Sequence, residues 1–485
     1  MRTGTAFLTA AALGALAPTG LLGQAQVLTK EYDNGGVYEG EFVDGRQQGQ
    51  GTYRLPNGYE YTGAWVDGRI EGEGRATYPN GSVYEGGFVD GRPQGRGRMT
   101  YPDGAVFEGD WATGRIEGQG VVTYPDGSVY EGGFVDGKQS GKGKLTAPDG
   151  LVYEGGWKDG VKSGEGRIVY PEGTVYEGEI AEGAPQGRGV MEKPDGTRYE
   201  GGWKAGVFDG EGVLVQANGD RYEGAFVGGL REGLGRAVLA DGSVYEGGFL
   251  ADRRSGAAVL TTADGARYTG TWVEGYLEGP GKLVFADGSS YEGGFAAGRR
   301  HGQGTMVFAD GSRYEGAWAE GAIAGPGKAT YTDGQVYEGT FRDGQSDGRG
   351  KLTRSDGYSY DGDWKAGARE GQGVAVYADG MRYDGGWKAG RFEGKGRLTL
   401  PGGQVFEGGF RDGELNGPGK ATYPDGSVYE GEFVDGQRQG RGIMRLASGR
   451  EIDGLWEAGQ PVGTGEAAVP GAAAAPTGTE SQPAE

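Results

Sequence analysis

One 23-residue pattern recurs along almost the whole chain, and it limits the fold more than any other feature. It opens with an aromatic residue and repeats eighteen times, from Tyr38 to Tyr429, without insertion or deletion. A nineteenth copy begins at Ile452 and stops near Gly463. A fixed period held over more than 400 residues predicts an array of equivalent structural units, not a set of globular domains. The 110 glycines fall at fixed places in this pattern, so they have a geometric role.

We number the opening aromatic residue of each repeat as position zero and the last residue as position 22. Positions two and eleven are Gly in all nineteen copies, and position twenty is Gly in all eighteen complete ones. Position four is Phe or Trp except at Ile180, and it holds all nine Trp residues. Side chains alternate between the faces of a strand, so positions zero, two and four share one face of a first strand. Positions thirteen, fifteen and seventeen share a face of a second strand, which we expect to begin after the glycine at position eleven.

Two turns complete each predicted hairpin. Asp-Gly or Asn-Gly at positions nineteen and twenty, as in Asp103-Gly104, is a strong hairpin signal because both residues can adopt positive φ. We assign the other connection to the glycine-containing stretch of positions seven to eleven, as in the sequence DGRPQG that ends at Gly95. Glycines at positions two and thirteen leave gaps over which aromatic rings can lie. A lone hairpin is marginal in water, so each repeat needs its neighbours.

This pattern resembles the membrane occupation and recognition nexus (MORN) repeat, and the resemblance extends over residues 38–463. It is clear in the repeat that carries these residues: Tyr84, Glu85, Gly86, Gly87, Phe88, Gly91, Gly95, Gly97, Asp103 and Gly104. The resemblance implies an all-β, elongated array of stacked antiparallel β-hairpins, a twisted sheet or rod with a 23-residue period and a shallow groove. It also implies a scaffold that binds proteins or membranes. The chain carries none of the catalytic domains found beside such repeats in other proteins, so the resemblance implies no lipid kinase activity.

Two repeats illustrate the residues that define the structure. They are Tyr84, Gly86, Phe88, Gly95, Gly97 and Gly104, and Tyr199, Gly201, Trp203, Gly210, Gly212 and Gly219. We expect the rings at positions zero and four to form the core. The alternative is an exposed platform on which sugars or bases stack.

The two ends of the chain differ from the array. Residues 1–25 have the features of a secretory signal peptide, with Arg2 before an apolar run and a small-residue cleavage site that ends at Ala25. Residues 26–37 form a lead-in, and residues 464–485 form an Ala/Pro/Gly-rich tail that we expect to be disordered. The chain has no Cys, which excludes disulfides and a lipid-modified cysteine. We therefore expect an exported bacterial protein, periplasmic or extracellular.

The charge of the chain limits its partners. The formal net charge of −21 argues against nucleic-acid binding and makes binding to an anionic membrane doubtful. Glu is common at position one and Lys or Arg at position fourteen, and alternation puts both on the face opposite the aromatic rings. We interpret them as a solvated mixed-charge ladder that limits aggregation. The alternative is a docking surface for a basic partner or a divalent cation.

No residue set predicts catalysis, a metal site or a cofactor. The single histidine, His301, stands in an expected turn at position ten, where other repeats carry Gln or Glu. The Asp-Gly turns lack the spacing of known calcium motifs, which leaves weak calcium binding as a minor alternative. The sequence therefore predicts a non-catalytic scaffold for protein–protein interaction in the cell envelope. The main alternative is a rod that binds envelope glycans or a membrane surface; glycan binding through the position-zero and position-four rings would need those rings exposed.

Two places break the regularity. The repeat that begins at Tyr245 has Asp252 and Ala258 where other repeats have Gly, which predicts a bend or a weak point. The nineteenth copy contains Trp456 but no evident second strand, so it leaves an open sheet edge. We therefore expect self-association through the C-terminal repeats.

Overall fold

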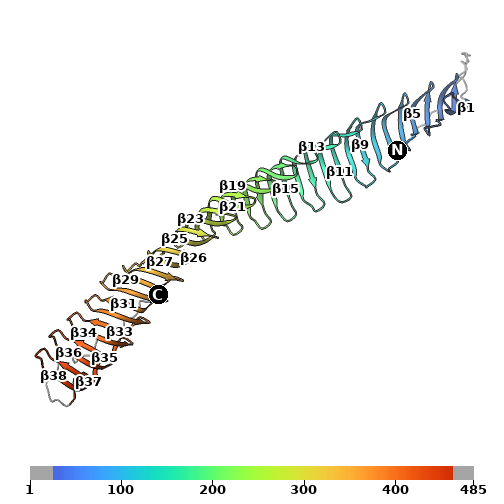
Figure 1. Ribbon diagram of the computed structural model, residues 1–485. Coiled ribbons are helices and arrows are strands. Elements are labelled where there is room, and N and C mark those ends of the chain that lie inside the picture. Colours follow the sequence, from blue (N-terminus) through green and yellow to red (C-terminus); the bar gives the residue numbers. More distant parts are fainter. Residues whose placement is uncertain (1–25, 463–485) are drawn as a thin grey trace, which may run out of the picture. The chain divides into compact units, whose positions relative to one another are not determined.

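The computed structural model describes residues 26–462. The predicted signal peptide and the predicted tail lie outside these residues. The described chain divides into an N-terminal unit, residues 26–217 with 226–229, and a C-terminal unit, residues 218–225 with 230–462. Both units consist of β-strands joined by short turns (Figure 1), which confirms the all-β expectation.

Each repeat contributes a first strand of seven residues and a second strand of nine. The first strands are β2 (Val37–Val43), β4 (Glu60–Val66), β6 (Val83–Val89), β8 (Val106–Ala112), β10 (Val129–Val135), β12 (Val152–Lys158), β14 (Val175–Ala181), β16 (Arg198–Lys204), β18 (Arg221–Val227), β20 (Val244–Leu250), β22 (Arg267–Val273), β24 (Ser290–Ala296), β26 (Arg313–Ala319), β28 (Val336–Arg342), β30 (Ser359–Lys365), β32 (Arg382–Lys388), β34 (Val405–Arg411), β36 (Val428–Val434) and β38 (Glu451–Glu457).

The second strands include a shorter one at each end of the described chain. They are β1 (Gln26–Glu31), β3 (Arg46–Arg54), β5 (Arg69–Thr77), β7 (Arg92–Thr100), β9 (Arg115–Thr123), β11 (Lys138–Thr146), β13 (Val161–Val169), β15 (Ala184–Glu192), β17 (Val207–Val215), β19 (Leu230–Val238), β21 (Arg253–Thr261), β23 (Tyr276–Val284), β25 (Arg299–Val307), β27 (Ala322–Thr330), β29 (Gln345–Thr353), β31 (Ala368–Val376), β33 (Arg391–Thr399), β35 (Glu414–Thr422), β37 (Gln437–Arg445) and β39 (Gln460–Pro461).

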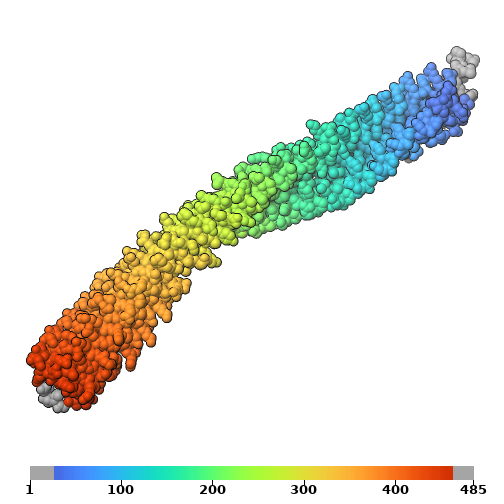
Figure 2. Space-filling model, viewed as in Figure 1, coloured from blue at the N-terminus to red at the C-terminus, as the bar shows by residue number. Residues whose placement is uncertain are grey.

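Within each unit, every strand pairs antiparallel with its neighbours in the chain. In the hairpin β6–β7, for example, Tyr84 lies opposite Met99 and Gly86 lies opposite Gly97. The same register recurs in β32–β33 of the C-terminal unit, where Gly385 lies opposite Gly396. Figure 2 shows the colours following the sequence in unbroken order within each unit, so residues close in space are close in the chain.

The turn within each repeat is tighter than the sequence indicated. The second strand begins at position eight, not after the glycine at position eleven, and only positions six and seven form the turn. In the Tyr84 repeat these are Asp90 (φ +47°) and Gly91 (φ +73°). Two-residue hairpin turns with positive φ at both residues are common because their twist matches the twist of the flanking strands. Gly95, with φ +78°, lies inside β7. It lies near the place where the register of β7 with β6 shifts, between Gly86 and Phe88 of β6. The expected long connection is therefore wrong, because a glycine bulge absorbs the extra residues within the strand.

The turn between repeats also differs from its prediction. Only the glycine has a positive φ there, as at Gly104 (φ +92°). The preceding Asp103 instead accepts a hydrogen bond through Oδ1 from the N–H of Ala105 at 3.0 Å. The N–H of Gly104 donates to the carbonyl oxygen of Tyr101 at 3.0 Å and closes the turn. The preference for Asp at position nineteen thus comes from its carboxylate and not from a positive φ.

The lead-in is itself part of the repeat pattern. Strand β1 pairs with β2, and Leu28 lies opposite Gly40 in the place that position thirteen takes in later repeats. Tyr32 then begins a turn in which the N–H of Gly35 donates to its carbonyl oxygen at 2.9 Å. The described chain therefore starts with the second half of a repeat. At the other end, the nineteenth copy does have a second strand, but β39 contains only two residues within the described range.

Candidate functional site

The aromatic face of each hairpin is closed by its own rings. In the repeat that begins at Tyr84, this ring is 0% exposed and that of Phe88 is 2% exposed. The Tyr84 ring meets Phe88 edge to face at 5.1 Å between centroids, and meets Trp111 of the next repeat at 5.0 Å. Its hydroxyl donates to the carbonyl oxygen of Gly87 at 3.1 Å. Each tyrosine therefore contacts two repeats and satisfies its own polar atom.

The glycines of this face make room for the tyrosine ring. A Cβ added at Gly86 would lie 2.8 Å from the Tyr84 hydroxyl, and one at Gly97 would collide with the same ring. Gly201 and Gly212 have the same relation to Tyr199. The ring thus lies across the paired glycines at positions two and thirteen, as the sequence predicted.

Seven of the nine tryptophans at position four add a hydrogen bond between repeats. Trp203 is 6% exposed, and its Nε1 donates to the carbonyl oxygen of Gly189 in the preceding repeat at 3.1 Å. Its ring lies 5.0 Å from that of Tyr176 and 5.4 Å from that of Tyr199. The remaining glycines singled out from this repeat lie at backbone bends, Gly210 with φ +97° and Gly219 with φ +93°.

Burial also changes the acidity of the position-zero tyrosines. Loss of solvent raises the pKa of Tyr84 to about 12, and nearby Glu73 and Tyr78 add to the shift. Burial likewise raises the pKa of Tyr130 in the N-terminal unit and of Tyr337 in the C-terminal unit to about 12. These phenols are neutral core groups and are poorly placed to act as acids or bases near pH 7.

Position nine is a part of the aromatic face that the sequence analysis missed. Pro93 and Leu277 at this position are buried, and Phe208 stacks on Tyr199 at 3.7 Å between centroids. In several repeats of the C-terminal unit the residue is Arg, as at Arg369, whose guanidinium carbon lies 4.6 Å from the centroid of the Trp387 ring. Extending the alternation of positions thirteen, fifteen and seventeen backwards through the bulge would have identified it.

The opposite face is polar and open, and its charges pair across the strands. Arg98 on β7 lies 3.0 Å from Glu108 on β8 and 3.9 Å from Glu85 on β6. Arg75 on β5 lies 3.3 Å from Glu85. Position fourteen thus pairs with position one on both sides. These side chains are about half exposed, so each pair adds little stability, and the ladder chiefly gives the face a regular mixed-charge pattern.

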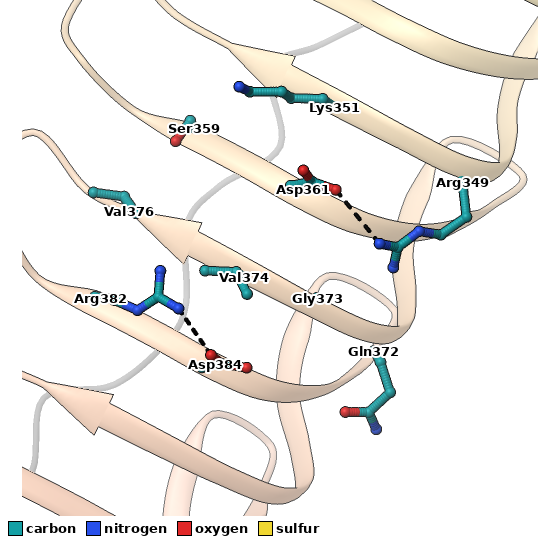
Figure 3. Close-up of a pocket in the computed structure, with 10 residues that line it drawn as sticks. All are labelled: Arg349, Lys351, Ser359, Asp361, Gln372, Gly373, Val374, Val376, Arg382 and Asp384. Atoms are coloured by element: carbon teal, nitrogen blue, oxygen red, sulfur yellow. Dashed lines mark hydrogen bonds and ion pairs between the residues drawn. The ribbon is translucent and has the colours of Figure 1, made fainter.

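Shallow hollows lie on this polar face, over the glycine pairs. One in the C-terminal unit has a volume of about 520 Å³ and is lined by Arg349, Lys351, Ser359, Asp361, Gln372, Gly373, Val374, Val376, Arg382 and Asp384. Figure 3 shows Arg349 directed at Asp361 and Arg382 at Asp384, and these pairs are 3.6 Å and 2.8 Å apart. A similar hollow of about 800 Å³ in the N-terminal unit includes Arg75, Arg98 and Glu108. They are open surfaces of both charges, and their linings contain no His or Cys.

The tight turns form a second exposed surface, which we call the turn edge. Positions five and eight flank each turn, and many carry exposed apolar residues, such as Val89 (50% exposed) and Tyr276 (60% exposed). Arginine at position eight pairs with the acid at position six of the next repeat, as in Arg69 and Asp90 at 2.8 Å. The turn edge thus combines exposed apolar side chains with paired charges, and it recurs with the period of the chain.

The structure gives His301 an ordinary place. It lies within β25, not in a turn, and it is exposed. At the same position in other repeats, Gln94 accepts a hydrogen bond from the N–H of Thr113 at 2.9 Å, and Glu117 accepts one from the N–H of Asp136 at 3.0 Å. Position ten therefore joins consecutive turns. In residues 26–462, no group of three His, Cys, Asp or Glu residues is arranged to hold a metal ion.

The repeat that begins at Tyr245 differs locally from the others. Asp252 keeps the turn with φ +69°, and its Oδ1 accepts hydrogen bonds from the backbone N–H and the Nε of Arg231 at 2.9 Å each. Ala258 lies opposite Gly247, and the indole N–H of nearby Trp272 has no hydrogen-bond partner among the described residues. The indole N–H of Trp111, in a regular repeat, also lacks a partner within residues 26–462, so this feature does not show a weak point at the Tyr245 repeat.

Comparison with known proteins identifies the repeat. The family model described as MORN repeat matches eighteen consecutive segments: 38–58, 61–83, 84–106, 107–129, 130–152, 153–175, 176–198, 199–221, 222–244, 245–267, 268–290, 291–313, 314–336, 337–357, 360–382, 383–405, 406–428 and 429–449. No curated protein matches the chain. Within residues 26–462, no helix has the length and apolar character needed to cross a bilayer.

Three solved structures are distantly similar to this chain. The SAS-4 TCP domain of Drosophila melanogaster, solved with a proline-rich motif of Ana2, is 14% identical, with 44% of this chain and 99% of that chain covered and a TM-score of 0.18. The TCP10 domain of Danio rerio CPAP is 14% identical, with 60% and 98% covered and a TM-score of 0.11. Virginiamycin B lyase from Staphylococcus aureus is 10% identical, with 68% and 95% covered and a TM-score of 0.11. Scores this low carry no argument about function.

Proposed function

The chain belongs to the MORN repeat family, whose repeats are non-catalytic modules typical of protein interaction, and we propose from this that it is a scaffold that binds a protein partner in the cell envelope. The observation that carries the proposal is the division of surfaces within each repeat. The position-zero and position-four rings are buried, as at Tyr199 (0% exposed) and Trp203 (6% exposed), except for the half-buried ring of Tyr268. The polar face and the turn edge are exposed and repeat with the period of the chain. A partner can therefore meet the same surface many times, which gives avidity to weak contacts.

Charge supports a protein partner over the alternatives. The net charge of −21 opposes contact with nucleic acids and anionic lipids. The polar face nevertheless carries both signs, as Lys351 and Asp361 show within one hollow. A mixed-charge surface beside exposed apolar side chains suits a folded or extended protein.

A glycan-binding array is the second candidate. Burial of the rings at positions zero and four removes them as a stacking platform. Two neighbouring rings at position seventeen are more exposed, Phe308 at 40% and Tyr331 at 42%, and they are the specific observation that favours this candidate.

Capture experiments with residues 26–485 distinguish the two candidates. We expect a defined protein from envelope extract to bind saturably and to persist in moderate salt. Substituting Val66 and Val89 on the turn edge by Ser, or Lys351 and Arg382 on the polar face by Glu, should weaken capture at least about tenfold if that surface is the contact. Capture unchanged in both variants would contradict protein binding through these surfaces.

The glycan arm uses sedimentation with insoluble cell-wall material. The matched control variant carries Phe308→Ala and Tyr331→Ala. Co-sedimentation of the parent chain that this variant loses, with no protein captured, would overturn the scaffold proposal. Mass spectrometry of the exported protein tests the envelope assignment, and a mature N-terminus at Gln26 is the expected result.

A further inference from the structure

Two strands of the described chain have an edge without a full partner. Strand β1 pairs with β2 along one edge, and we call the other edge of Gln26–Glu31 the β1 edge. Strand β38 pairs with β37 along one edge, and on its other edge β39 pairs only with Trp456 and Glu457. The rest of that second edge, Glu451–Gly454, is the β38 edge. Within residues 26–462 no strand covers the β1 edge or the β38 edge, so their backbone donors and acceptors are available to another strand.

The two edges belong to complementary parts of one repeat. A complete second strand has nine residues, at positions eight to sixteen. After the first strand β38, the strand β39 and Val462 provide positions eight to ten. The register of β1 against β2 places Gln26–Glu31 at positions eleven to sixteen. Within the described residues, one end of the chain thus has the positions of a second strand that the other end does not.

We propose that the β1 edge of one copy pairs antiparallel with the β38 edge of a second copy, and so completes the nineteenth repeat between two chains. The register is that of the complete hairpins, in which Gly97 lies opposite Gly86. In this register Leu28 lies opposite Gly454. The contact uses two different surfaces, so it can add one copy after another, unlike the pairing of two C-terminal ends. It does not depend on the protein partner proposed above.

Side chains of the aromatic face fit this pairing. In the complete repeats a large side chain at position thirteen is excluded, since a Cβ at Gly97 would collide with the ring of Tyr84. In β1 this position holds Leu28, which is exposed. In β38 the residue at position zero is Ile452, and a Cβ at Gly454 would meet no atom of the described residues within 4 Å. The Leu28 side chain can therefore fill the space that a tyrosine ring fills in the other repeats.

The polar face carries a second matched pair. Positions three and twelve of one hairpin meet on this face, as the N–H of Gln119 donates to Oδ2 of Asp110 at 2.9 Å. In the complete repeats position three is Gly, Ala, Thr, Asp or Glu, whereas β38 has Leu455 there. Position twelve of β1 is Val27, and Val27 and Leu455 are both exposed. The proposed pairing brings these two aliphatic side chains together and removes them from water.

Sedimentation velocity of residues 26–485 over a range of concentrations tests the proposal. We expect the average mass to rise with concentration above that of one chain. Leu28→Gly should weaken association at least about tenfold, because the space over Gly454 stays empty. Ile452→Tyr should also weaken it at least about tenfold, because the tyrosine ring takes the space of Leu28.

The chain with both substitutions is the decisive control. It has the Gly and the Tyr of a regular repeat at the contact, so its association should return to within about threefold of the parent chain. Losses that simply add in this chain would contradict direct contact between the two positions.

Thr29 provides a variant that blocks the β1 edge. Just after β1, the N–H of Tyr32 donates to the carbonyl oxygen of Gly36 at 2.8 Å, on the side of β2. Successive N–H groups of a strand point to opposite edges, so the N–H of Thr29 points to the β1 edge. Thr29→Pro removes this donor and leaves the pairing of β1 with β2 in place.

Asp453 provides the matched variant for the β38 edge. The carbonyl oxygen of Leu455 accepts a hydrogen bond from the N–H of Val462 at 2.8 Å, so the backbone groups of Leu455 point outward. Those of Asp453, two residues earlier, point the same way. Asp453→Pro should therefore block the β38 edge and keep β38 paired with β37.

Mixing the two proline variants identifies which ends meet. Each variant alone should associate at least about tenfold more weakly than the parent chain. An equimolar mixture should form pairs of chains that grow no further, because one open edge of each kind remains. Association of the Thr29→Pro chain with itself would assign the β38 edge to a second β38 edge and overturn the proposal. So would a parent chain whose mass stays that of one chain at every concentration, because no second copy then occupies either edge.

Discussion

The two units share one backbone pattern but fill position nine differently. In the N-terminal unit this position holds Gln47, Ile70, Pro93, Ile116, Gln139, Lys162, Pro185 and Phe208, with no Arg. In the C-terminal unit it holds Arg in five repeats: Arg231, Arg254, Arg300, Arg369 and Arg438. Each of these guanidinium groups lies over an aromatic ring of the same face, at 4.3 Å for Arg300 over Trp318 and 4.8 Å for Arg438 over Trp456.

The arginines also connect consecutive repeats. Arg300 donates through Nη2 to the carbonyl oxygen of Gly321 at 2.8 Å, and Arg438 donates to that of Gly459 at 2.7 Å. Each accepting glycine lies in the tight turn of the next repeat. In the N-terminal unit, apolar side chains take this place, as in the stack of Phe208 on Tyr199, or the residue is Gln47, Gln139 or Lys162. The same aromatic face thus accepts a charged, a polar or an apolar side chain at position nine.

Alkaline pH should destabilise both units to the same extent, and this loss of stability is the largest effect that we expect. The pKa of Tyr130 in one unit and of Tyr337 in the other is about 12, above the usual value of 10, because burial favours the neutral phenol. Between these pH values the folded state binds more protons than the unfolded state, so stability is full below pH 10 and falls as pH rises through about 12. Circular dichroism and tyrosinate absorbance should change together. Loss of structure in only one unit would show that the shared rings do not dominate stability.

Removing one tryptophan from each unit should lower the local free energy of unfolding by the same amount in both units. Trp203 lies 5.0 Å and 5.4 Å from its two tyrosine neighbours, and Trp387 lies 5.0 Å and 5.3 Å from its own. We expect Trp203→Ala and Trp387→Ala each to lower the local free energy of unfolding by about 3–5 kcal/mol. Hydrogen exchange should report the change in the substituted repeat and its immediate neighbours. A change that spreads through a whole unit would contradict nearest-neighbour stability.

Substitution at position nine should lower local stability more in the C-terminal unit than in the N-terminal unit. Arg369 is 7% exposed and donates to the carbonyl oxygen of Gly390 at 3.0 Å. Arg369→Ala should lower local stability by about 2–3 kcal/mol, because a charged hydrogen bond and a contact with the ring are both lost. The matched change Pro93→Ala in the N-terminal unit should lower it by less than about 1 kcal/mol.

Arg369→Lys tests whether charge alone is sufficient. An ammonium group cannot lie flat on the Trp387 ring while it donates to the carbonyl oxygen, so we expect recovery of less than half of the loss. Full recovery in exchange measurements would assign the role of Arg369 to its charge and not to its planar shape.

The period made most of this fold predictable, and the failures have specific causes. The place of Tyr84 over Gly86 and Gly97 follows from alternation along two short strands. The tight turn at Asp90-Gly91 was missed because the same dipeptide type also occurs between repeats, and sequence alone does not tell which pair takes two positive φ values. Position nine was missed because Arg369 and Ile116 share no chemical type.

The smallest expected effect concerns the turn between repeats. Position eighteen is Pro in the first seven repeats, as at Pro102, but in the C-terminal unit it is Pro only at Pro401 and Pro424. In the unfolded state, the N-terminal unit is therefore less flexible at these turns than the C-terminal unit. Proline that fits the native backbone stabilises a protein by about 0.4–1 kcal/mol.

Transferring proline to the C-terminal unit tests this difference at two matched sites. Among the described residues, the N–H of Ala286 donates no hydrogen bond, so Ala286→Pro should raise the local free energy of unfolding by about 0.4–1 kcal/mol. The N–H of Ala240 donates to Oδ1 of Asp220 at 2.7 Å, and Ala240→Pro removes that bond, so the gain should vanish or change sign. Denaturant titration, followed by hydrogen exchange at each turn, measures the change in local free energy of unfolding in both variants. If Ala240→Pro stabilised the protein as much as Ala286→Pro, the hydrogen bond from Ala240 to Asp220 would contribute nothing to stability.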